Sequence, residues 1–445
     1  MNDKLDILIR GGTLLTMSDS MEIIEDPLIG IRDGKILFAG KSADRPAVTE
    51  ADTVLDASGS IVMPGLINTH THLPMVCFRG LADDLSLMQW LNDYIFPAEA
   101  KFVNREMVYH GAMLAIAEMI LSGTTTFADG YFHESSIARA AVDAGMRAVP
   151  AQGIIDFSPP GERDIEKHVR IAEAFIRKWA DVSPLVSPAL FCHSPYSCAA
   201  ATLKRIKQVS EEAGVPYFIH AAETKDEVGL VASQTGETPI RYLRRLGVLD
   251  RRTVAVHCVW LEEDEMDILA DYGVSVSHTP ESNMKLASGI APVPRLLEKG
   301  VTVGLGTDGC ASNNDLDMLL EIDTTAKIHK IACMDPTVMD ARTVVRMATI
   351  DGARSLGMED RIGSVEAGKY ADLILIDLKK PHLTPLYNIY SHIVYAASGN
   401  DVSTSIIHGR IVMRNRRLYG LDAERLIEEV NRIAVQITKS RKSDR

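Results

Sequence analysis

Several features that mark other functional classes are missing from the sequence. It contains no run of roughly 18 or more apolar residues, so we expect no membrane-spanning helix. The first residues, MNDKLDILIR, are charged where an export signal needs its apolar core. Basic residues are outnumbered, since 47 Lys and Arg face 60 Asp and Glu, giving a net charge of −13 at pH 7. A nucleic-acid or anionic-membrane surface would need a basic excess, so we expect neither partner.

Cysteine is scarce and scattered. Only six occur in 445 residues, and no two are spaced C-x-x-C. This argues against a disulfide framework or a zinc knuckle and favours reduced thiols in a cytoplasmic protein. Glycine-rich loops that bind the phosphates of nucleotide cofactors are also missing from the helix starts. What is present, 46% hydrophobic and 24% charged residues, is typical of a globular protein with one large and one smaller domain.

From Ile61 onward the sequence repeats a short apolar strand, a loop and a longer helical stretch. Residues 105–121, for example, predict a helix that is capped by Asn104 and ends near Gly123. Eight such strand–helix units over about 300 residues favour a (β/α)8 TIM barrel over an open, doubly wound sheet. The predicted strands are residues 61–70, 124–129, 147–155, 185–193, 216–223, 253–258, 274–279 and 301–308.

Both ends of the chain have the pattern of β-structure. Asp33-Gly34 predicts a hairpin turn between two apolar runs, and a second hairpin is expected to turn at Gly409. The tail at 423–438 has the periodicity of an amphipathic helix. The β-like segments are residues 6–17, 28–40, 371–378, 392–398 and 403–415.

The simplest assembly packs the two β-rich ends into one small β-sandwich domain around an inserted barrel. The predicted division is residues 1–60 for the N-terminal part of the sandwich, 61–360 for the barrel, and 361–445 for the C-terminal part of the sandwich with the terminal helix.

Polar residues gather at the carboxyl ends of the predicted barrel strands, which meet at one mouth where active sites of this fold lie. His70 and His72 end the first strand, and residues two apart point to the same side, so both imidazoles face one centre. His220 and Asp308 complete a nitrogen and oxygen set suited to one divalent metal ion, zinc or alternatively iron. A lone strand-end histidine is usually a loop residue, and Asp308 before glycine could be a helix cap. The coincidence of several strand ends favours the metal site.

The motifs around these residues resemble a known family. PGLINTHTH, FIHAAE, HTPESNMKLASG and GLGTDGCASNNDLDM are similar to motifs of the amidohydrolase superfamily, and within it of the deaminases acting on 5′-methylthioadenosine and S-adenosylhomocysteine. The resemblance covers nearly the whole chain. Many superfamily members hold two metals bridged by a carboxylated lysine at the end of strand four. This chain has LFCHSPY there, with His193 and no lysine, which favours a one-metal site. The H-x-E and P-C-x-x-C signature of cytidine deaminases is absent.

The resemblance implies hydrolytic deamination of an adenine-type ring, in which a bound metal makes water acidic enough to attack. Glu223, three residues past His220, is expected to carry a proton to N1 of the ring, which requires burial to keep its carboxyl protonated. Asp308 is expected to take the proton of the attacking water, and His257 to hydrogen-bond the water or the developing oxyanion. An exposed glutamate at a helix start and a core histidine are the ordinary alternatives for Glu223 and His257.

The same resemblance suggests substrate contacts. Glu99 matches a carboxylate that accepts hydrogen bonds from the ribose hydroxyls, with a solvated loop residue as the alternative. His193 is expected near the purine and the ribose. Trp90 could pack on the purine or the 5′-substituent, although core filling explains it equally well. Ser312 is a weaker candidate for a polar contact.

One departure from the family pattern concerns the 5′-substituent. Relatives that accept S-adenosylhomocysteine carry an arginine just after the stretch that matches RAVPA, where it can bind a carboxylate bidentately, and this chain has Gln152 there. Arg163 matches a second family arginine only if the loop lengths agree. We therefore expect methylthioadenosine or adenosine to be preferred over S-adenosylhomocysteine.

Two alternatives stay open. Hydrolysis of another heteroaromatic ring, as in triazine chlorohydrolases or guanine deaminase-like enzymes, would use the same metal site, and Glu99 discriminates because a triazine has no ribose. A non-catalytic scaffold protein would be expected to have lost metal ligands, whereas this chain keeps all four. Membership of the family also implies a homo-oligomer, a dimer or a tetramer.

Overall fold

The computed structural model describes residues 4–44, 50–156 and 164–443. In this part of the chain the strands form three sheets, of eight, seven and four strands. The eight-stranded sheet is parallel and follows chain order from β8 to β15. It closes where Asp308 N–H donates to the carbonyl of His70 at 3.0 Å, which confirms the expected barrel. Its strands are β8 (Leu66–Thr71), β9 (Thr124–Tyr131), β10 (Arg147–Ile154), β11 (Ala189–Cys192), β12 (Tyr217–Ala221), β13 (Thr253–His257), β14 (Ser275–His278) and β15 (Val303–Leu305).

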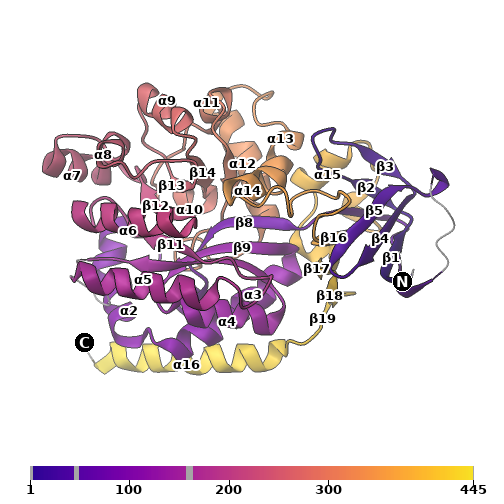
Figure 1. Ribbon diagram of the computed structural model, residues 1–445, viewed down its shortest axis with the longest axis horizontal. Coiled ribbons are helices and arrows are strands. Elements are labelled where there is room, and N and C mark those ends of the chain that lie inside the picture. The colour runs from indigo at the N-terminus through magenta and orange to yellow at the C-terminus, as the bar shows by residue number, and fades with distance from the viewer. Residues whose placement is uncertain (1–3, 45–49, 157–163, 444–445) are drawn as a thin grey trace.

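Helices cover the outside of the barrel (Figure 1). Helix α3 (Arg105–Ser122) begins after Asn104, whose side chain accepts hydrogen bonds from the backbone N–H groups of Glu106 and Met107. It ends at Gly123, which has a left-handed φ of 92°, as predicted. The other helices of the barrel are α4 (Glu134–Ala144), α5 (Ile165–Trp179), α6 (Ala200–Ala213), α7 (Lys225–Thr235), α8 (Pro239–Leu246), α9 (Glu263–Asp271), α10 (Pro280–Lys285), α11 (Val293–Glu298), α12 (Met318–Cys333), α13 (Ala341–Met347) and α14 (Ile350–Ser355).

The expected first barrel strand, residues 61–70, is in fact two strands. Strand β7 (Ser60–Pro64) pairs with β16 (Leu373–Asp377) in the seven-stranded sheet, and only β8 enters the barrel. Gly65 separates them, and a Cβ at this residue would lie 2.1 Å from the side chain of Thr125. The chain therefore changes sheet at a residue whose missing side chain permits the close approach. A continuous apolar run conceals such a break.

Strands from both ends of the chain lie beside the barrel (Figure 1). The seven-stranded sheet has the order β19-β18-β17-β16-β7-β2-β3, and the four-stranded sheet β5-β4-β1-β6. Ile9 and Ile31 of the shorter sheet share a buried cluster with Leu14 and Leu373 of the longer one, which is the packing of the expected β-sandwich. Their remaining strands are β1 (Leu5–Arg10), β2 (Thr13–Leu15), β3 (Ile23–Glu25), β4 (Pro27–Arg32), β5 (Lys35–Lys41), β6 (Ala51–Asp56), β17 (Val402–Ile407), β18 (Arg410–Arg414) and β19 (Arg417–Leu418).

Both predicted hairpins are present, β4–β5 turning at Asp33-Gly34 and β17–β18 turning at Gly409. The terminal helix is present as α16 (Ala423–Ser443), which packs against α3. No helix in the described part of the chain is long and apolar enough to cross a membrane. The domain boundaries at residues 60 and 360 stay a prediction.

The strand expected over residues 392–398 is wrong, because residues 392–395 belong to helix α15 (Ile389–Tyr395) and residues 396–398 lie in the turn that follows it. Asn388 caps the helix by accepting a hydrogen bond from Ser391 N–H. Its buried residues include Ile389, Ile393 and Val394, which are spaced as one face of a helix. A short run rich in β-branched residues does not distinguish a strand from one buried turn of helix.

A long connection between β8 and α3 passes over the barrel mouth. It consists of η2 (Leu73–Phe78), α1 (Leu87–Trp90), the π-helical turn η3 (Leu91–Ile95) and α2 (Phe96–Phe102). Short π-helical insertions are frequent at functional sites. Here the connection supplies part of the wall of the cavity described next.

Candidate metal centre and active site

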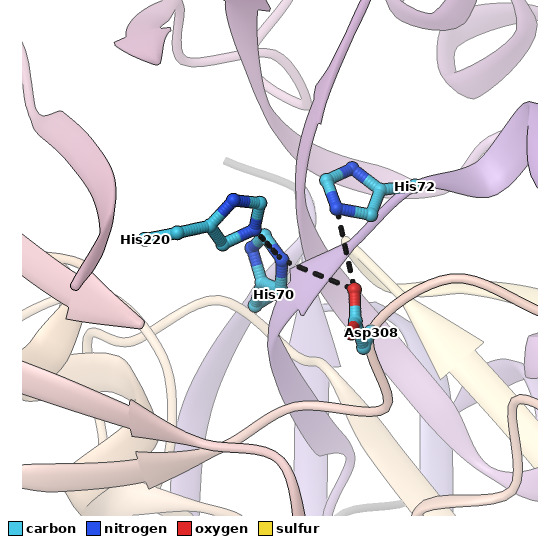
Figure 2. A group of neighbouring side chains, drawn as sticks. All are labelled: His70, His72, His220 and Asp308. Atoms are coloured by element: carbon cyan, nitrogen blue, oxygen red, sulfur yellow. Dashed lines mark hydrogen bonds and ion pairs between the residues drawn. The ribbon is translucent and has the colours of Figure 1, made fainter. Parts of the chain in front are cut away.

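Four predicted ligand residues meet at the mouth of the barrel. His70 and His72 lie at the end of β8, His220 near the end of β12, and Asp308 just after β15. Their ligand atoms all lie within 4.8 Å of one another, and all four residues are buried. Asp308 Oδ1 is 3.4 Å from His70 Nε2 and 3.2 Å from His72 Nε2, and the Nε2 atoms of His70 and His220 are 3.1 Å apart. Figure 2 shows the three rings and the carboxylate turned toward one another.

Hydrogen bonds from neighbouring groups orient the ligand side chains toward one another. His72 Nδ1 donates to the carbonyl of Gly130 at 2.6 Å, so Nε2 is the nitrogen directed at Asp308. The second carboxylate oxygen of Asp308 accepts from Ser282 Oγ at 2.7 Å and from Ser312 Oγ at 3.1 Å. Asp308 itself has a left-handed φ of 61°, a strained conformation of the kind that clusters at functional sites.

The protonation of these groups suits a divalent cation. Burial lowers the pKa of His70 to about 4 and that of His220 well below its usual value, so both rings are neutral at pH 7. Burial opposes the charge on His72, but the hydrogen bond and charge of Asp308 raise the pKa of His72 to about 9. Asp308 stays ionised because hydrogen bonds from His70 and His72 outweigh burial and hold its pKa well below the usual range. One carboxylate and three imidazoles converging in this way fit a single divalent metal, which would displace the proton on His72.

Glu223 and His257 stand beside this group. Burial and the charge of Asp308 raise the pKa of Glu223 to about 8, so its carboxyl is mostly protonated at pH 7. His257 Nε2 is 3.7 Å from Glu223 Oε2, while His257 Nδ1 is 2.8 Å from Thr279 Oγ1 and 3.0 Å from Asn283 Oδ1. Because these contacts hold Nδ1, Nε2 of His257 faces Glu223.

A cavity of about 730 Å³ opens over these residues, and its lining includes Glu223, His257 and Asp308. Glu99 and His193 line it as well. Glu99 belongs to helix α2 and is only 3% exposed, so it is not a solvated loop residue, whereas His193 follows β11 and is partly buried. His193 Nδ1 lies 2.8 Å from Ser197 Oγ, and burial lowers the pKa of His193 to about 3. Among the described residues, those lining the cavity include no lysine or arginine. Its apolar wall includes Leu87, Trp90, Leu91, Ile95, Phe96, Ile155 and Leu286.

The weaker predicted contacts fall in different places. Trp90 and Ser312 line the cavity. Gln152 does not; it precedes the lining residue Gly153 on β10, and its amide Nε2 donates to the Gly153 carbonyl at 3.1 Å. Arg163 lies outside the described residues.

Sequence reasoning missed several residues that support the site. Tyr131 donates its hydroxyl to Glu99 Oε1 at 2.6 Å, and it ends β9, so extending the strand-end rule by two residues past Asp129 would have found it. Glu227 accepts two backbone hydrogen bonds beside Glu223, and no pattern in the sequence signals that contact.

A closed parallel barrel with these residue types at its mouth defines the class of metal-dependent barrel hydrolases. Residues 61–412 match the model of the amidohydrolase family. The chain therefore belongs to the amidohydrolase family, as its motifs suggested.

Individual relatives agree with this. A 5-methylthioadenosine/S-adenosylhomocysteine deaminase from Syntrophobacter fumaroxidans is 48% identical over 433 residues, covering 97% of this chain and 98% of the relative. A 5′-deoxyadenosine deaminase from Methanosarcina acetivorans is 44% identical over 439 residues, covering 97% and 98%. The solved structure of an adenosine deaminase from Xanthomonas campestris with bound zinc matches with a TM-score of 0.95 at 38% identity, covering 98% of this chain and 99% of that one.

Proposed function

We propose that this amidohydrolase removes the amino group from the adenine ring of a 5′-modified adenosine, giving the hypoxanthine form and ammonia. The observation that carries the proposal is the layout of one cavity. Glu223 and the candidate metal ligand Asp308 line it, and so does the buried carboxyl of Glu99. Deamination of a purine nucleoside requires reactive groups at the ring and an acceptor for the ribose hydroxyls. The deaminase names of the relatives point to the same reaction.

The metal proposed for His70, His72, His220 and Asp308 is one zinc ion, the ion named with the Xanthomonas campestris relative, with iron as the alternative. A divalent cation bound there would supply a Lewis acid that makes water a competent nucleophile near neutral pH. A second metal is not proposed, because the segment after β11 has His193 and no lysine.

We assign the acid–base steps to three residues that line the cavity. Glu223, protonated at pH 7, donates its proton to N1 of the adenine, so that the ring can accept electrons as water attacks C6. Asp308, held ionised, accepts the proton of the attacking water and returns it to the departing ammonia. His257 directs Nε2 toward Glu223, and because Nδ1 donates to Asn283 Oδ1, Nε2 accepts a hydrogen bond from the attacking water and orients it.

The remaining contacts concern the sugar and its 5′-substituent. Glu99 accepts hydrogen bonds from the ribose diol, and His193 contacts the purine or ribose. Trp90 packs on the apolar part of the substrate, and Ser312 acts mainly by bonding Asp308. With no cation among the described lining residues, a methylthio or deoxy group fits the cavity better than the zwitterionic amino-acid tail of S-adenosylhomocysteine. This is the preference that Gln152 suggested.

The test is a panel of substrates followed by loss of adenine absorbance and release of ammonia. We expect kcat/KM for 5′-methylthioadenosine and 5′-deoxyadenosine to exceed that for S-adenosylhomocysteine by at least about tenfold, the effect of one unpaired charged group. Free adenine, guanine and a chlorotriazine serve as controls. Hydrolysis of the triazine or guanine without turnover of any nucleoside would establish the alternative heteroaromatic activity. A clear preference for S-adenosylhomocysteine would refute the proposed 5′-specificity.

A homo-oligomer, dimer or tetramer, and a cytoplasmic location are also inferred. Light scattering of the purified protein tests the first, and cell fractionation tests the second.

A further inference from the structure

The turn that carries Glu223 has an unusual backbone. Strand β12 ends at Ala221, and Ala222 then adopts a left-handed φ of 54° although it has a side chain and is fully buried. Such a conformation is strained for a residue with a side chain and persists only where neighbouring groups hold it. The carbonyl of Ala222 accepts hydrogen bonds from the N–H groups of Val259 and Trp260, both at 2.9 Å. The N–H groups on the other side of the turn need their own partner.

That partner is the carboxylate of Glu227, in the first turn of α7. Its Oε1 accepts the N–H of Ala222 at 3.1 Å, and its Oε2 accepts the N–H of Glu223 at 2.6 Å. Glu227 is 5% exposed and does not line the cavity. Its own N–H donates to Thr224 Oγ1 at 3.1 Å, which ties it to the helix start.

This differs from an ordinary capping box. In that motif the glutamate at the third helical position bonds the N–H of the capping residue itself. Here the capping residue is Thr224, and Glu227 instead bonds the two residues before it. The contact therefore serves the turn that aims Glu223 more than the start of the helix.

We propose that Glu227 is a positioning residue for the reaction: by bonding both N–H groups of the 222–223 turn, it holds the Glu223 side chain at the barrel mouth. The inference rests on the proposed role of Glu223 in deamination. Among the described residues that line the substrate cavity Glu227 is absent, and its carboxyl bonds the Glu223 turn directly, so the positional effect of Glu227 on the reaction passes through Glu223.

The first test replaces Glu227 by an isosteric amide. Glu227→Gln has one acceptor oxygen where the turn needs two, and its NH2 group faces a backbone donor. Misplacement of a catalytic group by about 1 Å costs on the order of 100-fold in rate. We expect kcat on 5′-methylthioadenosine to fall by that order while KM changes less than about threefold and metal content is unchanged. Asp226→Asn, an exposed neighbour in the same helical turn, is the matched control and is expected to keep wild-type kcat.

A second measurement separates positioning from a general loss of structure. In a Glu223→Asp background, with its slower but measurable turnover, adding Glu227→Gln should lower kcat by less than about threefold, because residues that act through one another are not additive. An equal loss of about 100-fold in both backgrounds would overturn the proposal. So would wild-type kcat in Glu227→Gln. If the amide variant does not fold, Glu227→Asp, which keeps both acceptor oxygens, should show the same dependence on Glu223.

Amide hydrogen exchange provides a readout that does not need catalysis. The N–H groups of Ala222 and Glu223 should be protected in the wild-type protein and lose protection at least about tenfold in Glu227→Gln, with other amides of β12 unchanged. Unchanged exchange at both amides would refute the proposal that Glu227 holds the 222–223 turn. A wild-type protein that turns over no nucleoside refutes the proposed function instead, so the two failures are distinguishable.

Discussion

Tyr131 donates its phenolic hydroxyl to Glu99 Oε1 across 2.6 Å, and both residues line the substrate cavity. The bond joins the end of β9 to helix α2 in the connection over the barrel mouth. Burial raises the pKa of Glu99 to about 7, and the Tyr131 hydrogen bond opposes that rise by stabilising the carboxylate. Tyr131 therefore favours the ionised form of the group proposed to bind the ribose.

Changing Tyr131 to Phe is expected to weaken substrate binding. Without the hydroxyl, the pKa of Glu99 rises further, so more of the carboxyl is protonated at pH 7 and accepts fewer hydrogen bonds. KM for 5′-methylthioadenosine should increase about fivefold, the effect of about one hydrogen bond, with kcat nearly constant. Steady-state kinetics check this. A fall in kcat at unchanged KM would contradict the role of Tyr131 in substrate binding.

The pH dependence of KM should report Glu99 directly. Its pKa is raised to about 7, so the carboxyl is mostly protonated at pH 6 and mostly ionised at pH 8. Because the ionised form accepts both ribose hydroxyls, KM for nucleosides should fall about fivefold as pH rises through 7. The matched control is 2′,3′-dideoxyadenosine, which lacks the diol and should show a flat profile over this range. A parallel fall with the dideoxy substrate would exclude Glu99 as the diol acceptor.

Glu223→Gln should abolish most turnover without affecting metal binding. The amide cannot transfer a proton to N1, and a positioned acid contributes about 100- to 10,000-fold to such rates. We expect kcat to fall within that range, with metal content by elemental analysis equal to wild type. Glu212→Gln on the exposed part of α6 is the control for the substitution itself. Normal turnover of Glu223→Gln would show that another group delivers the proton.

Removing the metal should stop the reaction reversibly. Chelation is expected to abolish activity and to lower Tm, because a bound ion stabilises only the folded state. Adding back zinc, iron or manganese in turn identifies which ion restores the rate. His220→Ala should lose bound metal, whereas His110→Ala on α3, at a residue outside both the ligand group and the cavity lining, should retain it. Full activity after exhaustive chelation would refute the metal site.

The Arg147–Asp372 ion pair should be important for stability. Arg147 on β10 is 1% exposed, and its guanidinium bonds both oxygens of Asp372, just before β16, at 2.5 and 3.0 Å. Arg147→Ala leaves a buried carboxylate unpaired and should cost about 3 kcal/mol of unfolding free energy. The exposed pair Arg139–Asp143 is the comparison, and Arg139→Ala should cost less than about 1 kcal/mol. Urea titration measures both; equal losses would contradict the argument.

Much of the fold could be predicted from the periodicity of the apolar residues and from capping and turn residues. Helix α3 could be placed from Asn104 and Gly123 because a cap and a left-handed glycine are local signals. The segment 392–395 could not, because its helical conformation depends on what Ile393 and Val394 pack against. Likewise, the division at Gly65 reflects the pairing of β7 with β16, a strand more than 300 residues away, which no local window of sequence records.

The same distinction between local and long-range signals applies to the candidate site. His70, His72, His220 and Asp308 were predictable because parallel strands bring their carboxyl ends together whatever the loops do. Tyr131 lies at the end of β9 and could have been found by the same rule, but its bond to Glu99 depends on the course of the connection between β8 and α3. Glu227 could not be predicted, because its hydrogen bonds depend on the geometry of the 222–223 turn. Supporting residues are thus harder to infer than the residues they support.

The single-residue link at Gly65 makes the molecule difficult to dissect. Strand β7 belongs to the sheet built from both chain ends, yet five residues beyond Gly65 stands His70. A barrel expressed without the first 65 residues would begin at the strand that carries two candidate ligands, with no anchor before it. A barrel that kept β7 would present an unpaired edge strand, with the aggregation risk that such edges bring. The β-rich ends are therefore not a detachable module, and any minimal version of this hydrolase has to retain them.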